Sequence, residues 1–284
     1  MTDIVPLHYS IDIAHSEQET KQRHAENRLA WNEAASKYRL SNEERVSLLR
    51  AGHSTLHPIE RQNFLRLGNL RDWCKQAIHL QCASGQDTLS LLLEGAREVI
   101  GVDISDVHIE NARWTSEQLQ FPARWIQCDI LDIPHELDGT ADLVYTGRGA
   151  INWIHDIEAW AKIVARLLKP NGVLSLLEDH AVTWLFDNEA TSLSPSTYGY
   201  FNICEASRGW PNSYLGNLGK PVEEEQLKYE RLWTPSDVIQ ALLDAGLALV
   251  YFGEHNLEYW PSFPKLNEQD KVKLPLTFSI LARK

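Results

Sequence analysis

Residues 77–103 read AIHLQCASGQDTLSLLLEGAREVIGVD, and this stretch decides the fold. Its first apolar run, AIHLQC at 77–82, predicts a strand. A short loop containing Gly85 leads into a predicted helix over about 87–94, which the following glycine is expected to end. The second apolar run, EVIGVD at 98–103, predicts another strand. A strand, a helix and a strand in this order are typical of a parallel sheet.

The same alternation continues toward the C-terminus. Three more apolar runs predict strands at 124–129, 141–146 and 172–178. Before the last of these strands, apolar residues recur at helical spacing from Ile157 to Leu168, and the sequence KPNG ends the helix. We therefore expect an α/β fold with a doubly wound, mostly parallel sheet.

The end of the chain predicts one edge of this sheet. Thr234 and Pro235 have the residue types of a helix N-cap and a first helical position. Two further apolar runs, at 248–253 and 276–283, predict strands joined by a long connection. Such a connection suits an antiparallel pair at the sheet edge, which brings the expected sheet to seven strands.

The chain divides into four predicted parts. Residues 1–70 form an N-terminal helical extension with a predicted helix at 17–50, and residues 71–180 form the core. Residues 181–232 combine many aromatic side chains with Pro, Gly, Ser and Asn, which predicts an insertion that acts as a lid over a substrate. Residues 233–284 complete the core.

Composition narrows the function classes. A net charge of -12 without a Lys or Arg cluster disfavours nucleic acids and anionic membranes as partners. The first thirty residues lack the apolar core of a signal peptide, and no run approaches the roughly 18 apolar residues of a membrane helix. We therefore expect a cytoplasmic protein. The four cysteines lack CxxC spacing, so we predict neither a disulfide framework nor a metal site.

Three features at the predicted strand ends indicate a nucleotide-like cofactor. The loop at Gly85 lets backbone N–H groups approach a ligand, although an ordinary strand-to-helix turn also explains one glycine. Asp103 follows eighteen positions later, close to the spacing of about twenty residues expected for a carboxylate that accepts ribose hydroxyls. A solvated charge or a helix cap is the alternative for Asp103. Asp129 is placed to meet an adenine amino group, with Ile130 on the ring, or to cap the next turn.

Together these segments resemble the ordered motifs of class I S-adenosylmethionine-dependent methyltransferases that act on small molecules. The resemblance rests on HLQCASGQDTLSL, VIGVDIS, CDILDIP, ADLVYTGRGAINWIHDIEAWAKIVARLLKPNG and LEDH, and it covers about residues 25–180. It is strongest with a subgroup whose first motif reads LHLQC-x-x-G-x-DTL. This sequence departs from the broader class at Gln81 and Ala83, where glycines are usual, and at His79, where an acidic residue often stands.

The resemblance implies S-adenosyl-L-methionine as the cofactor and assigns residues to its parts. Those expected around the methionine part are Gln81, Cys82, Ala83, Gly85, Asp87 and Thr88. Those expected at the ribose are Asp103, Ile104 and Ser105, and those expected at the adenine are Asp129 and Ile130. Those expected at the methyl-donor sulfur are Thr146 and Gly147, with Trp31 closing the site from the N-terminal helix.

The implied reaction is an in-line displacement at the methyl carbon, and a general base is needed only when the nucleophile carries a proton. Tyr145, Glu178 and His180 are the candidate bases. Because side chains two apart in a strand share a face, we predict that Glu178 and His180 pair and face the substrate. The alternative is that His180 only hydrogen-bonds to a loop backbone.

Aromatic side chains are the candidates for binding an apolar or ring-bearing small molecule. The candidates are Trp153, Trp184, Tyr198, Tyr200, Phe201 and Trp210. Packing within an ordinary insertion is the alternative reading of these rings. Arg148 is expected either to steer an anionic substrate or to pair with a nearby carboxylate.

Two other function classes share part of this pattern. A nicotinamide-dependent oxidoreductase also uses a ribose-binding acid, but QCASGQ has one glycine where its GxGxxG motif has three. A non-catalytic protein that senses S-adenosylmethionine or S-adenosylhomocysteine is the second alternative.

Overall fold

Seven strands form the central sheet of this computed structural model, which describes residues 7–201 and 203–284. They lie in the order β4-β3-β2-β5-β6-β10-β9. Strands β2 to β6 pair in parallel, and β10 runs antiparallel to both β6 and β9, as predicted. The strands are β2 (Gln76–Leu80), β3 (Glu98–Asp103), β4 (Ala123–Gln127), β5 (Ala141–Gly147), β6 (Leu168–Asp179), β9 (Ala248–His255) and β10 (Thr277–Arg283).

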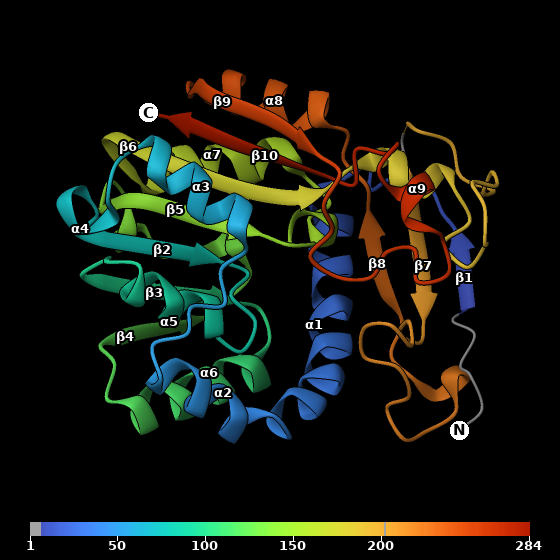
Figure 1. Cartoon of the computed structure of the whole chain (residues 1–284), viewed down its shortest axis with the longest axis horizontal. Coiled ribbons are helices and arrows are strands. Elements are labelled where there is room, and N and C mark those ends of the chain that lie inside the picture. Colours follow the sequence, from blue (N-terminus) through green and yellow to red (C-terminus); the bar gives the residue numbers. More distant parts are fainter. Residues whose placement is uncertain (1–6, 202) are drawn as a thin grey trace.

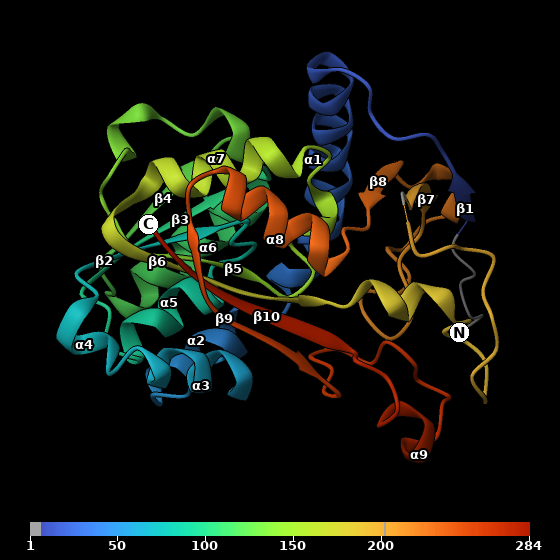
Figure 2. The same cartoon turned by 90° about the horizontal axis from the view of Figure 1, so that it is seen from above.

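Helices cover both faces of this sheet, so the fold is doubly wound (Figure 2). Helices α7 and α8 lie on one face, and α2, α3 and α5 lie on the other. The helices are α1 (Glu17–Arg39), α2 (Asn42–Arg50), α3 (Pro58–Arg66), α4 (Leu70–Trp73), α5 (Gln86–Leu93), α6 (Asp106–Leu119), α7 (Ile157–Leu167), α8 (Pro235–Asp244) and α9 (Glu268–Lys271). The two faces have separate apolar cores.

Helix α7 shows why the sequence pattern predicts this arrangement. Its residues Ile157, Trp160, Ala161, Val164 and Leu167 are all buried, and they recur every three or four positions. Burying each large apolar side chain of such a stripe stabilises the fold by about 1.5–3 kcal/mol. The stripe therefore fixes which side of α7 faces the sheet.

The order of the strands creates a switch point at β2. The chain places β3 and then β4 on one side of β2, and it returns to place β5 and β6 on the other side. In sheets of this type, ligands bind in the crevice beyond the carboxyl ends of the strands at the switch point. The loops after β2, β3 and β5 are therefore the ones that form the candidate site.

A second, three-stranded sheet lies beside the core (Figure 1). It contains β1 (Leu7–Ser10), β7 (Cys204–Arg208) and β8 (Lys228–Arg231), all antiparallel. The predicted helical extension therefore includes a strand, and the predicted insertion at 181–232 forms its sheet together with the N-terminal segment. The extension's first residues, 1–6, lie outside the described part of the chain.

Helix α1 stands between the core and the second sheet (Figure 1). The predicted helix at 17–50 is two helices, because α1 ends before Leu40 and α2 begins at Asn42. The buried Asn27 side chain bonds both backbone groups of Tyr229 in β8, at 2.8 Å and 2.6 Å. In the ranges that the structure describes, no helix is both long enough and apolar enough to cross a membrane.

Candidate functional site

The loop after β2 follows a glycine-like backbone path even where glycines are absent. Gln81, Ala83 and Gly85 have positive φ angles of 57°, 45° and 79°. A left-handed conformation costs a residue with a Cβ atom roughly 1–2 kcal/mol. Gln81 and Ala83, which stand where the class usually has glycines, therefore keep the left-handed path of the loop. Contacts elsewhere in the fold offset the backbone strain at these two residues.

Gly85 has a second constraint, because the Trp125 ring fills the space beside it. A Cβ atom at position 85 would lie 2.4 Å from the Trp125 ring. Gly85 directly precedes the first residue of α5, so the free N–H groups of the first helical turn lie just beyond β2. This is the arrangement that favours an anionic or polar ligand at a helix N-terminus.

Asp103 joins the loops after β2 and β3. Its carboxylate accepts hydrogen bonds from the backbone N–H groups of Ala83 and Ser105, each at 2.8 Å. The side chain is buried, and this burial raises its pKa to about 6, although backbone N–H groups act in the opposite direction. The predicted pairing of the 81–85 loop with Asp103 is therefore a direct contact, and the carboxylate oxygens have lone pairs left for a ligand.

The residues after Asp103 connect this loop to α1. The Ser105 hydroxyl caps α6 by accepting from the His108 N–H at 3.1 Å and donates to Asn32 of α1 at 2.6 Å. The Ile104 carbonyl accepts from the Gln127 amide at 2.9 Å. Ser105 thus positions the loop as the N-cap of α6.

Asp129 has a partner that spacing did not reveal. Its Oδ2 lies 2.7 Å from Nδ1 of His24 in α1, and its Oδ1 accepts from the Leu131 N–H at 3.0 Å. Burial acts to raise the pKa of Asp129, but the hydrogen bond and charge of His24 outweigh it and leave the pKa below its usual value. Asp129 therefore caps the next turn, the alternative given above. The predicted adenine neighbour Ile130 is buried within the core.

Buried polar atoms without partners occur along the crevice. Thr146 Oγ1 and Gln81 Oε1 have no hydrogen-bond partner among the described residues. The Gln81 amide nitrogen donates to the Ala150 carbonyl at 2.5 Å and so ties the first loop to the loop after β5. A Cβ at Gly147 would lie 2.6 Å from the Leu177 carbonyl oxygen, which explains the glycine there. Buried polar atoms of this kind fit a polar ligand that completes their hydrogen bonds.

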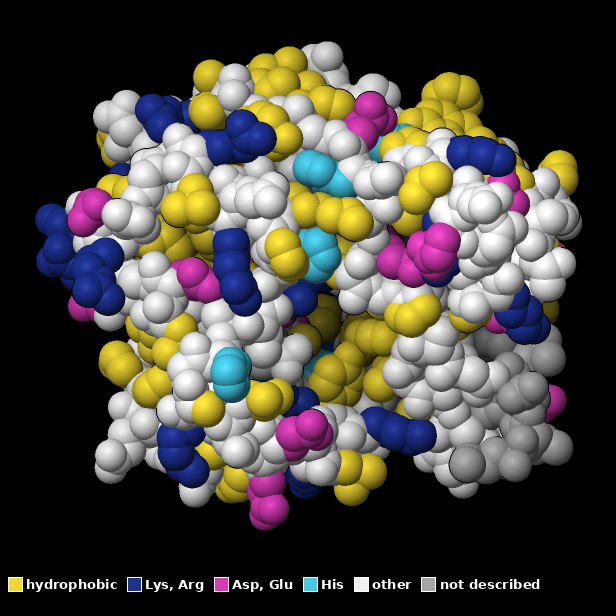
Figure 3. All heavy atoms as spheres, viewed as in Figure 1, with side chains coloured by type: hydrophobic (Ala, Val, Ile, Leu, Met, Phe, Trp, Pro, Cys, Tyr) yellow, Lys and Arg dark blue, Asp and Glu magenta, His cyan; other side chains and the backbone are white. Residues whose placement is uncertain are grey.

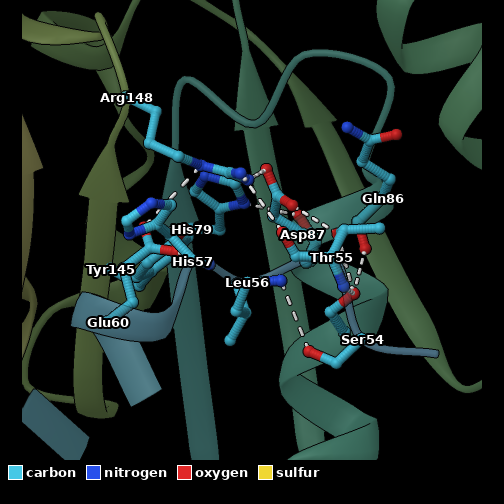
Figure 4. A network of polar contacts seen from close by, with 12 residues as sticks. Ser54, Thr55, Leu56, His57, Glu60, His79, Gln86, Asp87, Tyr145 and Arg148 are labelled. Carbon is cyan, nitrogen blue, oxygen red and sulfur yellow. Dashed lines mark hydrogen bonds and ion pairs between the residues drawn. The ribbon is translucent and has the colours of Figure 1, made fainter. Parts of the chain in front are cut away.

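A network of charged side chains supports the same loops (Figure 4). Arg148, whose φ is 64°, forms an ion pair with Asp87 and lies 3.8 Å from Glu60. The Thr55 hydroxyl donates to Asp87 at 2.5 Å. Arg148 was expected either to steer an anionic substrate or to pair with a carboxylate, and in the structure it pairs with carboxylates. Asp87 holds the loops in place through these contacts.

Three other predicted residues lie in or beside this network. The Tyr145 hydroxyl donates to Glu60 at 2.6 Å, and burial raises the pKa of Tyr145 well above its usual value. Thr88 Oγ1 lies 2.7 Å from Nδ1 of His79, whose pKa burial lowers to about 3. Cys82 packs into the apolar core with its side chain, so only its backbone is available to a ligand in the crevice.

The predicted pair of Glu178 and His180 is wrong. Glu178 accepts from the N–H groups of Gly149, Ala150 and Ile151, at 2.8–3.1 Å. His180 lies beyond the end of β6, where its Nε2 is 3.0 Å from Glu254 and its Nδ1 accepts from the Val182 N–H at 3.1 Å. The strand ends at Asp179, so the alternation that predicts a shared face stops before His180. The backbone hydrogen bond of the alternative is present, but His180 also contacts the Glu254 side chain.

The predicted aromatic residues separate into two groups. Trp31, Trp153 and Trp210 pack together, with ring centroids 4.8–6.0 Å apart, and they join α1 to the loop after β5 and to the second sheet. Elsewhere, Trp184 contacts Tyr198 and Tyr200 contacts Phe201, and 74% of Phe201 is exposed. The structure therefore brings only the first group to the crevice.

Sequence reasoning missed several residues of this site. No sequence pattern pointed to His24, His108, Thr55 or Glu60. His108 contacts the loop through Ser84 at 2.8 Å. These contacts join positions far apart in the chain, so spacing gave no signal for them. Within the described ranges, no group of three His, Cys, Asp or Glu side chains could hold a metal ion.

Figure 3 shows a hollow in the centre of one face, between the core and the second sheet, with hydrophobic side chains along its wall. Figure 1 shows β2 pointing toward α1 at the same place. A crevice at the switch point that is covered by a second sheet and lined with rings encloses a ligand on several sides.

Comparison with known proteins shows what the segment that forms this crevice is similar to. Residues 77–172 match the family model of a methyltransferase domain. The chain is similar in structure to an S-adenosylmethionine-dependent methyltransferase from Clostridium acetobutylicum, with 15% identity and a TM-score of 0.59 over 87% of this chain and 98% of that chain. None of the curated proteins matches this sequence.

Two other solved structures share the fold. Geranyl diphosphate C-methyltransferase from Streptomyces coelicolor is 13% identical, with a TM-score of 0.51 over 78% of this chain and 75% of that chain. The [4+2]-cyclase SpnF is 14% identical, with a TM-score of 0.54 over 88% of this chain and 94% of that chain. At these identities the likeness concerns the fold alone.

Proposed function

We propose that this chain is an S-adenosylmethionine-dependent methyltransferase that transfers the methyl group to a small-molecule acceptor. The match of residues 77–172 to a methyltransferase domain supports this proposal. The cofactor of this class is S-adenosyl-L-methionine. The observation that carries the proposal is the contact between Asp103 and the left-handed loop after β2. We also propose that the chain belongs to the subgroup with the LHLQC-x-x-G-x-DTL motif.

The residues present fit this cofactor. Asp103 offers buried carboxylate oxygens to the ribose hydroxyls, and Ile104 and Ser105 follow in the same loop. Gln81 and Thr146 have buried oxygen atoms without partners, and both belong to the segments expected at the methionine part and the sulfur. Trp31 lies over the crevice from α1 and contacts Trp153 and Trp210. These observations support the proposed cofactor contacts.

When bound, S-adenosylmethionine supplies a methyl carbon on a positively charged sulfur. The chain's own residues then align the acceptor and exclude water. Well-oriented groups gain on the order of 7–11 kcal/mol from proximity, so alignment supplies much of the barrier reduction. Trp153 and Trp210 are the residues that we expect to enclose the acceptor.

The proposed mechanism assigns no general base to Tyr145, Glu178 or His180. Each of these side chains already has hydrogen-bond partners, and Tyr145 and Glu178 are fully buried. We therefore expect His180→Ala to retain normal turnover with an unchanged pH profile. A loss of turnover with an altered pH profile would restore His180 as the base.

Calorimetric titration with S-adenosylmethionine, S-adenosylhomocysteine and NADH tests the proposal. We expect wild-type protein to bind the first two compounds, Asp103→Ala to lose most of this affinity, and the exposed-surface variant Glu117→Gln to behave like wild type. Binding of NADH alone would support an oxidoreductase instead.

A second measurement separates catalysis from sensing. Metabolites in an extract supplied with protein and S-adenosylmethionine are screened by mass spectrometry for the gain of one CH₂. We expect at least one such product. Cofactor binding without any product would support a non-catalytic sensor. A net charge of -12 supports a small molecule rather than a nucleic acid as the acceptor.

A further inference from the structure

Glu178 is a fully buried carboxylate near the end of β6 that holds the loop after β5. The Gly149 N–H donates to its Oε2 at 2.8 Å, and the N–H groups of Ala150 and Ile151 donate to its Oε1 at 2.9 Å and 3.1 Å. The preceding N–H, that of Arg148, donates to a backbone carbonyl of β6 at 2.6 Å. Four consecutive amides of this loop are therefore fixed to β6.

The backbone of this loop has the form of an anion site. Arg148 and Gly149 both have positive φ angles, of 64° and 83°. Successive N–H groups in such a turn form a concave site for an anion, and here the anion is the protein's own Glu178. A left-handed residue with a Cβ atom is unfavourable, so this path persists only where other contacts hold it. Glu178 supplies those contacts.

The shape of the side chain does not explain the choice of an acid at this position. Burial raises the pKa of Glu178 to about 8, and the charge of Asp179 adds to this shift, whereas the three N–H groups oppose it. A glutamine would fill the same space without the cost of burying a charge. Only a carboxylate, however, has two oxygen atoms that both accept, as the three N–H groups require.

The Ala150 carbonyl extends this contact to the loop after β2. It accepts from Gln81 Nε2 at 2.5 Å. An amide oxygen in the same place would face the carbonyl oxygen, so this contact fixes the orientation of the Gln81 amide. Oε1 is the other end of the amide, and it is buried without a partner in the ranges that the structure describes. Glu178, Ala150 and Gln81 thus form a chain of contacts that ends in a free hydrogen-bond acceptor.

A buried acceptor of this kind fits a ligand that donates a hydrogen bond. In the methionine part of S-adenosylmethionine, only the ammonium group carries such a donor. The nearby acid Asp87 is already engaged by Arg148 and by the Thr55 hydroxyl (Figure 4). The Gln81 oxygen is therefore the acceptor of this region that still lacks a donor.

We propose that Glu178 is a positioning residue for the cofactor, which orients the Gln81 amide through the Ala150 carbonyl so that Gln81 Oε1 accepts a hydrogen bond from the ammonium group of the methionine part. Glu178 itself touches neither the cofactor nor the acceptor. With Asp103 at the ribose and Gln81 at the ammonium group, the cofactor is held on both sides of its sulfur, which aligns the methyl carbon. This inference rests on the proposed methyltransferase function and adds to it.

The test compares two ligands that differ in the methionine part. S-adenosylhomocysteine contains the amino-acid group, whereas 5′-methylthioadenosine keeps the adenine, the ribose and the sulfur without it. Affinities are measured by calorimetry at a pH above 8, where the Glu178 carboxylate is ionised.

Glu178→Gln keeps the side-chain volume, but its NH₂ group must face at least one backbone N–H and so breaks the contact. We expect its affinity for S-adenosylhomocysteine to fall at least roughly tenfold, and its affinity for methylthioadenosine to stay within about twofold of wild type. Equal losses for the two ligands would overturn the inference, because they would show a general loosening of the site. Unchanged affinity for S-adenosylhomocysteine would overturn it as well.

A double variant tests whether Glu178 acts through Gln81. Gln81→Met removes the amide at similar length and is expected to weaken S-adenosylhomocysteine binding at least roughly tenfold, with little change for methylthioadenosine. Adding Glu178→Gln to Gln81→Met should then cause no further loss, because the residue that Glu178 orients is already gone. Losses that multiply would show independent effects and would overturn the proposed connection.

Asp179→Asn is the matched control, because it also removes a buried carboxylate from the end of β6. Asp179 accepts from the Trp260 ring N–H at 3.2 Å. We expect this variant to keep the wild-type affinity for both ligands. A selective loss of S-adenosylhomocysteine binding equal to that of Glu178→Gln would overturn the assignment to Glu178.

Two further outcomes separate the hypotheses. If wild-type protein fails to bind S-adenosylhomocysteine, the proposed function fails. If wild-type protein binds it and Gln81→Met binds it equally tightly, only the inference on Glu178 and Gln81 fails. Binding of methylthioadenosine shows that Glu178→Gln is folded, and Gln81→Met decides the matter if it is not.

Discussion

Gly85 and Ala83 share a left-handed backbone, but only Gly85 also faces an aromatic ring. In Gly85→Ala the new Cβ would lie 2.4 Å from the Trp125 ring, at a residue with a φ of 79°. We expect this variant to lose about 2–4 kcal/mol of unfolding free energy, measured from urea transitions. Ala83→Gly is the matched control, because relief of strain and gain in chain entropy offset each other to within about 1 kcal/mol. Wild-type stability of Gly85→Ala would contradict this explanation.

The ionisation of Asp103 makes cofactor binding depend on pH. Burial raises its pKa from 3.8 to about 6, so the folded protein takes up a proton here before the unfolded chain does. The Asp103 contribution to the unfolding free energy therefore increases as pH falls from about 6 toward 3.8. Affinity for S-adenosylhomocysteine changes in the opposite direction, because the protonated carboxyl accepts ribose hydrogen bonds less well.

Calorimetry across pH tests this prediction. We expect the affinity of the wild-type protein to fall below pH 6, by up to about tenfold per pH unit. Asp103→Asn should bind weakly at every pH. Asp179 also has its pKa raised to about 6 by burial, so Asp179→Asn is the control and should keep the pH dependence of wild type. A flat pH profile in Asp179→Asn would show that Asp179, rather than Asp103, causes the pH dependence of binding.

Single residues also show the limit of sequence analysis for the site. The spacing of Gly85 and Asp103 predicted neighbouring loops, and both lie at ends of paired strands. The contact of Asp129 with His24 joins residues 105 positions apart, so no local pattern encodes it. The predicted pairing of Glu178 with His180 failed for another reason. Strand β6 ends at Asp179, so the alternation of side chains between its two faces stops before His180.

At the scale of elements, the buried Asn27 amide is a main contact of helix α1 with β8. Asn27 satisfies the N–H and the carbonyl of Tyr229, and Asn27→Ala leaves both backbone groups without this partner. An unsatisfied buried polar group costs about 1–3 kcal/mol, so we expect a loss of roughly 2–4 kcal/mol in urea unfolding. Gln22→Ala, on the exposed side of the same helix, should change stability by less than about 0.5 kcal/mol. An equal effect of both variants would show that the amide contact is unimportant.

Elements differ in how well sequence predicts them. The strand at 98–103 is found at its predicted bounds, because four apolar or small residues between Glu98 and Asp103 form a clear pattern. The three strands of the second sheet were missed. Each has only four or five residues, and β1 pairs with β7 across about two hundred positions of the chain. Such strands depend on tertiary contacts rather than on their own periodicity.

At the scale of the whole molecule, α1 connects the cofactor loops to the second sheet. It contacts the loop after β3 through Asn32 and Ser105, and it contacts β8 through Asn27. A ligand that orders the Asp103 loop therefore also stabilises the position of α1 and, through α1, the second sheet. Ligand binding to the folded state raises its stability by about 2.7 kcal/mol at a hundredfold excess over Kd.

Hydrogen exchange measured with and without S-adenosylhomocysteine tests this connection. We expect slower exchange in the 81–85 loop, in α1 and in β8, because these segments form one chain of contacts from Asp103 outward. Strand β9 at the far edge of the sheet pairs only with β10 and should exchange at the same rate in both states. Protection confined to the 81–85 loop would show that α1 does not transmit the effect. Loss of the α1 and β8 protection in Asn27→Ala, with the loop still protected, would place the coupling at that single contact.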